Sequence, residues 1–219
     1  MSAAAPKTDA KFYQHPNAIV DSKRIGAGTR VWAFAQVMNG AVIGKDCNIG
    51  GHAFIEAGAK IGNGVTVKNG VAVWEGVTVD DFAFLGPNAV FTNDLRPRSP
   101  RFPGGKIRYQ TKAWVSKTRV GKGASIGANA TVVCGTKIGA FAMIGAGAVV
   151  THDVPAHTLM LGVPARPAGF VCECGDELVF RAGKAKCPQC GAQYVGPNLS
   201  SAKPAGLKSR PTHRVKRVK

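Results

Sequence analysis

Four cysteines near the C-terminal end have the spacing of a metal site. They form two close pairs, Cys172 with Cys174 and Cys187 with Cys190, and a glycine follows each pair. Four thiolates in two pairs suit tetrahedral zinc, and a site filled by four protein ligands has no open position for catalysis. The first pair is separated by one residue instead of the usual two. The sequence therefore predicts a structural zinc site in a small module over residues 170–196, with a redox pair or plain thiols as the alternative.

A second segment with residues suited to ligand binding, residues 94–113, contains several arginines together with prolines and glycines. Guanidinium groups pair well with phosphate and carboxylate groups. We therefore expect Arg96, Arg98 and Arg101 to bind an anionic part of a ligand. The prolines exclude a regular coil here, so the segment should project as a loop, and long loops of this kind are usually functional. A mobile, solvated loop is the alternative.

These residues must be positioned by a six-residue repeat that runs through most of the chain. Aliphatic or aromatic residues recur at every sixth position from Ile19 to Phe91, and the repeat returns between Val120 and Val150. Helices need a three-and-four spacing and ordinary strands alternate by two. A sustained hexad therefore predicts an all-β fold of short strands that turn at regular corners, a parallel β-helix.

The repeat also predicts which polar residues stack. With three hexads in each coil, residues 18 positions apart lie on one face, about 4.8 Å from each other. Glu75 and Asn93 have this separation, and Asp94 follows directly. His52 should lie two coils below Asn88 on a second face. Glu75 and Asp94 are thus candidates to bind or deprotonate an ammonium group.

The composition divides the chain into further parts. Residues 1–16 lack the repeat and should form a loose N-terminal segment, and residues 197–219 should form a basic, disordered tail. The formal net charge of +17 calls for an acidic partner. We expect either a weak polyanion contact by the tail or a solvated, silent tail. No stretch resembles a signal peptide or approaches the ~20 apolar residues of a membrane span, which predicts a cytoplasmic protein without a membrane span.

Residues 17–169 resemble the left-handed β-helix hexapeptide-repeat acyltransferases. The segment Gly145-Ala-Gly-Ala-Val-Val, followed by Gly162-Val-Pro-Ala-Arg166, looks like the end of that family's helix, where coenzyme A is held. The motifs Val73-Trp-Glu-Gly-Val77 and Gly86-Pro-Asn-Ala-Val-Phe-Thr-Asn-Asp94 are similar to the branch that N-acetylates nucleotide-linked 3-amino sugars. Residues Trp32-Ala-Phe-Ala-Gln36 lack the histidines common at this point of the branch. The resemblance implies a homotrimer with active sites between adjacent subunits.

The resemblance also implies roles for individual residues. Asn93 should position the amino sugar, next to the candidates Glu75 and Asp94. Asn88 and His52 are expected substrate contacts, although His52 can equally be an ordinary surface side chain. Acetyl-CoA needs a flat slot and cations for its phosphates; the expected residues are Gly127, Ala128, Lys137, Gly145, Ala146 and Arg166. His152 and His157 should be structural or lie at a subunit seam.

These observations predict an N-acetyltransferase. It would transfer acetyl from acetyl-CoA to the amino group of a UDP- or dTDP-linked amino sugar, in polysaccharide or glycoconjugate synthesis. The alternative is a non-catalytic β-helix scaffold that binds nucleic acid or another polyanion through the zinc ribbon and the basic tail. A β-helix carbonic anhydrase is disfavoured, because only His52 lies well within the coils.

Overall fold

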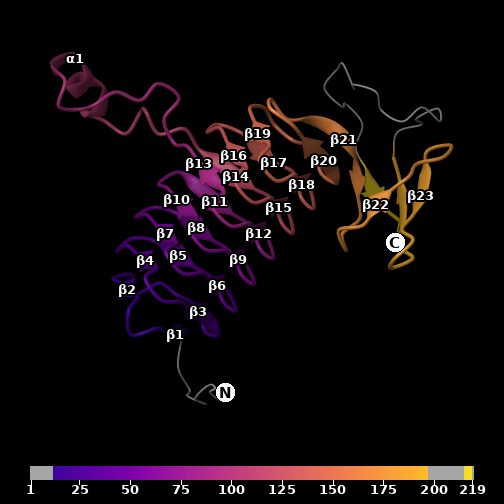
Figure 1. The fold of residues 1–219 in the computed structure, drawn as a ribbon, viewed down its shortest axis with the longest axis horizontal. Coiled ribbons are helices and arrows are strands. Elements are labelled where there is room, and N and C mark those ends of the chain that lie inside the picture. The colour runs from indigo at the N-terminus through magenta and orange to yellow at the C-terminus, as the bar shows by residue number, and fades with distance from the viewer. Residues whose placement is uncertain (1–11, 197–214, 219) are drawn as a thin grey trace.

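The chain folds into a parallel β-helix whose coils place one short strand on each of three walls (Figure 1). The computed structural model describes residues 12–196 and 215–218. The first wall begins with β1 (Phe12–Gln14), β3 (Thr29–Val31), β6 (Asn48–Ile49), β9 (Thr66–Val67), β12 (Phe84–Leu85), β15 (Ser125–Ile126) and β18 (Met143–Ile144). The second consists of β2 (Ile19–Val20), β4 (Gln36–Val37), β7 (Phe54–Ile55), β10 (Ala72–Val73), β13 (Val90–Phe91), β16 (Thr131–Val132) and β19 (Val149–Val150). The third consists of β5 (Val42–Ile43), β8 (Lys60–Ile61), β11 (Val77–Val79), β14 (Thr118–Val120) and β17 (Lys137–Ile138).

The predicted hexad supplies the core. Strand β10 pairs in parallel with β7 and β13 through Ala72↔Phe54 and Ala72↔Val90, which confirms the 18-residue coil. The repeated aliphatic residues point inward and are fully or nearly fully buried, as Ile55 and Val73 show. A second inward column lies two positions earlier in each hexad and consists mainly of small residues, such as Ala53. Burial of both columns is the main stabilising contribution to the coil.

Three corners join the walls. The first corner follows the first wall (residues 32–35, 50–53, 68–71, 86–89, 127–130 and 145–148). The second corner follows the second wall (38–41, 56–59, 74–76, 92–117 and 133–136), and the third follows the third wall. Many corner residues have positive φ angles, including Gly64 at 63°. A Cβ atom at Gly64 would lie 2.6 Å from the Phe82 ring of the next coil, so only glycine fits there.

The N-terminal coil differs from the prediction by one residue. Ile19 was expected to point inward but its side chain is 57% exposed, and Val20 pairs with the buried Val37. The cause is that the coil is one residue shorter at this end. The side chains of β2 therefore point to the opposite faces from those that the repeat predicts. Residues Phe12–Gln14 form β1 against β3, where a loose segment was expected. Residues 1–11 lie outside the described residues.

The arginine-rich segment projects from the second corner, as predicted. Strand β11 pairs with β14 through Thr78↔Arg119, so the chain leaves the coil after β13 and resumes it at β14. The loop is therefore slightly longer than residues 94–113. It carries a short helix, α1 (Pro103–Lys106), followed by the 3-10 turn η1 (Ile107–Tyr109), at its far end (Figure 1). Neither was expected from the sequence.

The C-terminal end continues the first wall beyond the coils. Strand β20 (Thr158–Leu161) pairs in parallel with β18, so the parallel wall extends past Val150, the last position of the predicted repeat. Strands β21 (Arg166–Val171) and β22 (Glu177–Leu178) then add antiparallel. A separate small sheet contains β23 (Lys184–Lys186), β24 (Gln193–Val195) and β25 (Lys216–Arg217).

This C-terminal module has a hydrophobic cluster of its own, which includes Phe170, Phe180 and Tyr194. Strand β25 belongs to the tail that was expected to be disordered, so that expectation is wrong for residues 215–218; residues 197–214 and 219 lie outside the described part. Among the described residues, no helix is long and apolar enough to cross a membrane.

Candidate active site

The second corner brings Glu75 and Asn93 together. Glu75 follows β10 and Asn93 follows β13, and these strands are paired neighbours. The Asn93 side-chain amide lies 3.5 Å from the Glu75 carbonyl oxygen, a long contact. The backbone N–H of Glu75 donates a 2.7 Å hydrogen bond to the Glu56 carboxylate of the preceding coil. The expected stacking is confirmed, and Glu56 is an additional acidic side chain that the sequence analysis missed.

The Glu75 carboxylate binds a primary ammonium group in this structure. Lys112, from the returning arm of the loop, places its Nζ 2.6 Å from Glu75 Oε2. The lysine side chain is mostly exposed and also lies over the Trp114 ring, 5.7 Å from its centre. An exposed pair of this kind contributes little stability, so another ammonium group can replace the lysine at low cost. Glu75 is thus a carboxylate that is open to a cationic amine.

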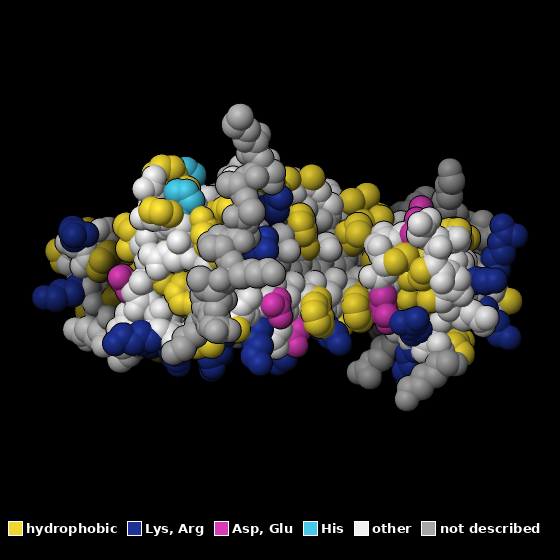
Figure 2. All heavy atoms as spheres, turned by 90° about the horizontal axis from the view of Figure 1, so that it is seen from below, with side chains coloured by type: hydrophobic (Ala, Val, Ile, Leu, Met, Phe, Trp, Pro, Cys, Tyr) yellow, Lys and Arg dark blue, Asp and Glu magenta, His cyan; other side chains and the backbone are white. Residues whose placement is uncertain are grey.

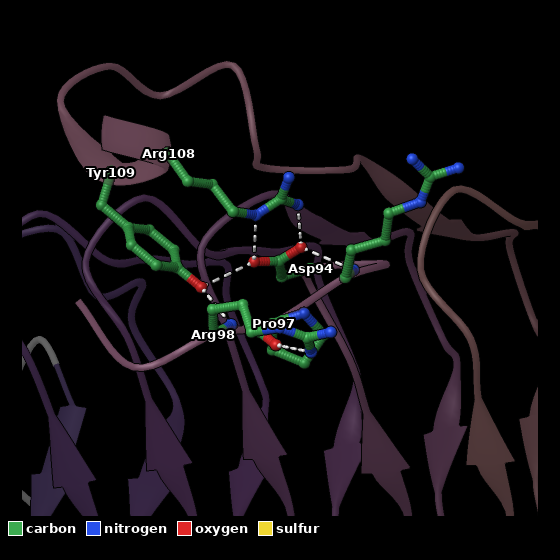
Figure 3. A network of polar contacts seen from close by, with 6 residues as sticks. Asp94, Pro97, Arg98, Arg108 and Tyr109 are labelled. Atoms are coloured by element: carbon green, nitrogen blue, oxygen red, sulfur yellow. Dashed lines mark hydrogen bonds and ion pairs between the residues drawn. The ribbon is translucent and has the colours of Figure 1, made fainter. Parts of the chain in front are cut away.

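Asp94 holds the two arms of the loop together (Figure 3). Its carboxylate accepts hydrogen bonds from the Arg108 guanidinium, from the Tyr109 hydroxyl at 3.0 Å and from the backbone N–H of Arg96 at 2.8 Å. The Asp94 side chain is only 7% exposed. The hydrogen bonds from Arg108 outweigh desolvation and, with those from Arg96 and Tyr109, lower the pKa of Asp94 to about 2. Such a carboxylate is a weak base with its oxygens already bound.

The same network orders the cationic arm. The Tyr109 hydroxyl accepts a 2.9 Å hydrogen bond from the backbone N–H of Arg98, and the Tyr109 ring packs edge-on against Trp114. Arg96, Arg98 and Arg101 are exposed on the arm that leaves the coil. The pairing of Arg108 with Asp94 was not predicted from the sequence, nor were the contacts of Tyr109 and Lys112. These contacts could have been expected from the sequence, because a loop that leaves and re-enters the coil brings the basic residues of its returning arm close to the acidic residues at its start.

The first corner carries His52 and Asn88, two coils apart as expected. Both have positive φ angles, at 58° and 55°, and the intervening position is Gly70, against which the Asn88 side chain lies. His52 stacks on Phe34 of the preceding coil, with ring centres 5.1 Å apart. Within one protomer these residues lie at the opposite end of the second wall from Glu75 and Asn93.

The residues expected to hold coenzyme A lie partly together. Gly127 and Ala128 stack on Gly145 and Ala146 at the first corner, and a Cβ at Gly127 would lie 2.5 Å from the Ala146 nitrogen. Arg166 reaches the same end of the helix, because the N–H of the preceding Ala165 donates to the Val149 carbonyl. Lys137 is different, since it lies on the third wall in β17. Within one protomer the structure does not bring Lys137 to this corner.

The four cysteines of the C-terminal module converge. Their sulfur atoms lie within 4.8 Å of one another, with Cys172 Sγ 3.4 Å from Cys190 Sγ and Cys174 Sγ 3.5 Å from Cys187 Sγ. Sulfur ligands of tetrahedral zinc, at about 2.3 Å from the metal, are separated by about 3.8 Å. The N–H of Gly175 donates to the Cys172 carbonyl three residues earlier, and the N–H of Gly191 donates to the Cys187 carbonyl four residues earlier, so that a turn closes around each pair. The donor set and spacing fit a tetrahedral metal ion.

The coils match the pattern of the family described as bacterial transferase hexapeptide (six repeats), over residues 22–57 and 117–152. The dTDP-3-amino-3,6-dideoxy-alpha-D-galactopyranose 3-N-acetyltransferase of Aneurinibacillus thermoaerophilus is 50% identical over 83% of this chain and 90% of its own length. The chain belongs to the hexapeptide-repeat acyltransferases. Serine acetyltransferase 4 of Arabidopsis thaliana is 48% identical, over 25% of this chain and 15% of its own length. Among solved structures, the acetyltransferase domain of PglB from Neisseria gonorrhoeae FA1090 is 24% identical and has a TM-score of 0.49; the match covers 71% of this chain and 57% of that one.

Among the described residues, two groups of polar side chains could take part in acyl transfer, and they lie at two corners of the same coils. Glu75, Asn93 and the loop anchored by Asp94 lie at the second corner, and His52 and Asn88 lie at the first. The family membership confirms the predicted enzyme class and opposes the non-catalytic scaffold. The roles of the individual residues stay predictions.

Proposed function

We propose that this acyltransferase transfers an acetyl group from acetyl-CoA to the amino group of a dTDP- or UDP-linked amino sugar. The observation that carries the proposal is the 50% identity to the dTDP-amino-sugar N-acetyltransferase over 90% of that protein. In the reaction, the neutral amine forms a C–N bond to the thioester carbonyl carbon. The C–S bond then breaks, the amine nitrogen loses its proton, and coenzyme A leaves as the thiol.

Glu75 has the geometry of an ammonium-binding residue. Its carboxylate already binds the Lys112 ammonium, and a sugar ammonium would take the place of that group. A neighbouring carboxylate favours the charged form of an amine, so Glu75 assists binding and does not assist deprotonation. A sugar amine is partly neutral near pH 7, and a dedicated base is therefore not required. Asn93 orients the sugar beside Glu75, which places the nitrogen for attack.

Asp94 acts as a positioning residue in this proposal. Its carboxylate is bound by Arg108, Tyr109 and the backbone of Arg96, which fixes the arm that carries Arg96, Arg98 and Arg101. Those guanidinium groups would then be presented to an anionic group of the bound ligand. Acetyl-CoA would lie along the first corner at Gly127, Ala128, Gly145 and Ala146, with Arg166 near its phosphates.

Acetyl transfer can be tested directly. Purified protein is incubated with acetyl-CoA and a panel of dTDP- and UDP-linked 3-amino sugars, while free thiol and acetylated product are measured. We expect turnover with at least one sugar, and Asn93→Ala should lower kcat/KM by about tenfold or more. Asn39→Ala is a matched control, because Asn39 lies in the same column of the second corner three coils earlier. Absence of thiol release with every sugar, from protein that also fails to bind acetyl-CoA, would overturn the proposal.

We further propose that the four cysteines hold a structural zinc ion. The module has a small core, and a metal would supply stability that so short a segment lacks. Metal analysis of the purified protein should give about one zinc per chain, and Cys187→Ser should remove it. Cys134→Ala, which alters a buried thiol of the coil, should retain the metal. Protein without metal that keeps a folded C-terminal module would contradict the assignment.

We also propose that the β-helix is left-handed and that the protein forms a homotrimer, as the family resemblance implies. The loop exposes Leu95, Phe102 and Ile107, whose side chains are 59%, 65% and 70% exposed. A neighbouring subunit would cover such a group of apolar side chains. Sedimentation should therefore show a trimer, and Phe102→Ser with Ile107→Ser should weaken it.

A cytoplasmic location is also proposed, because the six cysteines are unpaired, which is typical of reducing compartments.

A further inference from the structure

A depression of about 550 Å³ lies on the first corner of the N-terminal coils, away from Glu75 and Asn93. Its aromatic wall consists of Trp32, Phe34 and His52, and its polar wall includes Asn48, Lys68 and Asn69. Figure 2 looks toward this end of the molecule and shows histidine side chains among a group of hydrophobic ones. The described lining residues contain a lysine and no acidic side chain.

The aromatic side chains of the depression are exposed but held in fixed positions. Trp32 is 38% and Phe34 is 53% exposed. The indole N–H of Trp32 donates a 2.7 Å hydrogen bond to Asn48 Oδ1, and Tyr13 packs against the Trp32 ring. Phe34 is stacked on His52, with an interplanar angle of 21°. Ordered, exposed aromatic faces are typical of sites that stack a flat ligand ring.

The floor of the depression is kept flat by glycine. A Cβ at Gly50 would lie 2.7 Å from Asn69 Oδ1 and 2.8 Å from the Asn69 backbone nitrogen. A side chain at this position would therefore displace Asn69. Beside the floor, the Asn69 amide can hydrogen-bond to carbonyl and N–H groups, and the Lys68 ammonium suits a phosphate. The depression thus combines a flat apolar surface with amides and one cation.

The depression and the proposed acetylation site lie on either side of the second wall, along one coil. Asn69 leads into β10, and Glu75 lies six residues further along the same coil. Six extended residues span at most about 20 Å, a length that a nucleotide sugar can cover. The expected acetyl-CoA slot at Gly127 and Gly145 belongs to later coils of the first corner. Acetyl-CoA, the acetyl donor, and the nucleotide sugar, the acceptor, would therefore approach from opposite ends of the β-helix.

We infer that this depression binds the pyrimidine base of the nucleotide sugar, with the ring against Trp32 and Phe34 and the diphosphate beside Lys68. The inference rests on the proposed function and adds the site that recognises the nucleotide. It assigns the nucleotide specificity of the enzyme to residues outside the arginine-rich loop.

Calorimetric titration of the full-length protein with dTDP and, separately, with inorganic pyrophosphate tests the assignment. Phe34→Ala should weaken dTDP binding by about tenfold or more, because base stacking is lost, and should leave pyrophosphate binding unchanged. Lys68→Ala should weaken both ligands. Phe82→Ala is a matched control: Phe82 is also an exposed corner phenylalanine, with a φ of 60° against 63° for Phe34. Thermal melts of each variant check that the fold is retained.

Steady-state kinetics separate this inference from the proposed function. Phe34→Ala should raise KM for the nucleotide sugar while kcat and KM for acetyl-CoA stay close to the wild type. Acetyl transfer with equal dTDP affinity in wild type and Phe34→Ala would overturn the base site and leave the proposed function intact. A changed oligomeric state with unchanged dTDP affinity would also overturn it, in favour of a second copy of the chain on this surface. Failure to acetylate any sugar would refute the proposed function itself.

Discussion

Replacement of Asp94 with alanine should release the arginine-rich loop without unfolding the β-helix. Asp94 accepts hydrogen bonds from the Tyr109 hydroxyl and the Arg96 backbone N–H, besides its pair with Arg108. The Arg108 pair is screened by solvent and is left out of the sum. A hydrogen bond to a charged group contributes about 1.5–3 kcal/mol, and the full or partial exposure of the donating residues Arg96 and Tyr109 roughly halves this, which gives about 1.5–3 kcal/mol for the two bonds together. The open loop should therefore become about 10 to 150 times more populated.

Limited trypsin digestion measures this opening, because the loop contains many arginine and lysine residues. Cleavage of the loop should accelerate by about the same factor when opening is fast relative to cleavage. The thermal midpoint should change little, since the loop lies outside the buried core. Asp80→Ala is the matched control, because Asp80 forms a 2.9 Å pair with Arg119 on the third wall. Equal loop cleavage in Asp94→Ala and wild type would refute the proposed anchoring role.

Glu75→Gln should raise KM for the amino sugar more than it lowers kcat, because the ammonium group loses its carboxylate partner. Lys112→Ala should leave this KM unchanged or lower it, because the lysine ammonium occupies the same carboxylate. A higher KM in Lys112→Ala than in Glu75→Gln, measured by steady-state kinetics, would show that Lys112 does not occupy the place of the substrate amine. Hydrogen bonding from Arg108 lowers the pKa of Asp94 from 3.8 to about 2. The loop anchor should therefore be complete above about pH 4 and be lost as the pH falls toward 2, so pepsin should cleave the loop faster over this range, and Asp94→Asn should remove the pH dependence. Ile55→Ala should lower the free energy of unfolding by about 2–5 kcal/mol, measured by urea denaturation, because Ile55 is fully buried between coils; a loss below 1 kcal/mol would contradict the packing.

The sequence predicted the coils well because each coil repeats a local rule. An inward aliphatic residue at every sixth position specifies strand, corner and register together, and the pairing of β7, β10 and β13 follows from it. The prediction failed where the rule was interrupted. One residue fewer in the first coil exposed Ile19, and helix α1 formed over Pro-Gly-Gly-Lys, a segment with poor helix propensity. Strand β25 could not be predicted, because it pairs with β24 across the 20 residues 196–215.

For the candidate site, the repeat by itself determined that Glu75 and Asn93 lie side by side, since an 18-residue period leaves no other arrangement. The four-cysteine site was likewise predictable, because its ligands are close in sequence. Only the tertiary structure decided that Asp94 is bound by Arg108 and Tyr109, that Lys112 reaches Glu75, and that Lys137 lies on a different wall. Those contacts depend on the path of a loop without a repeat. The physical difference is that periodic burial fixes positions locally, whereas loop closure joins residues whose separation no local pattern encodes.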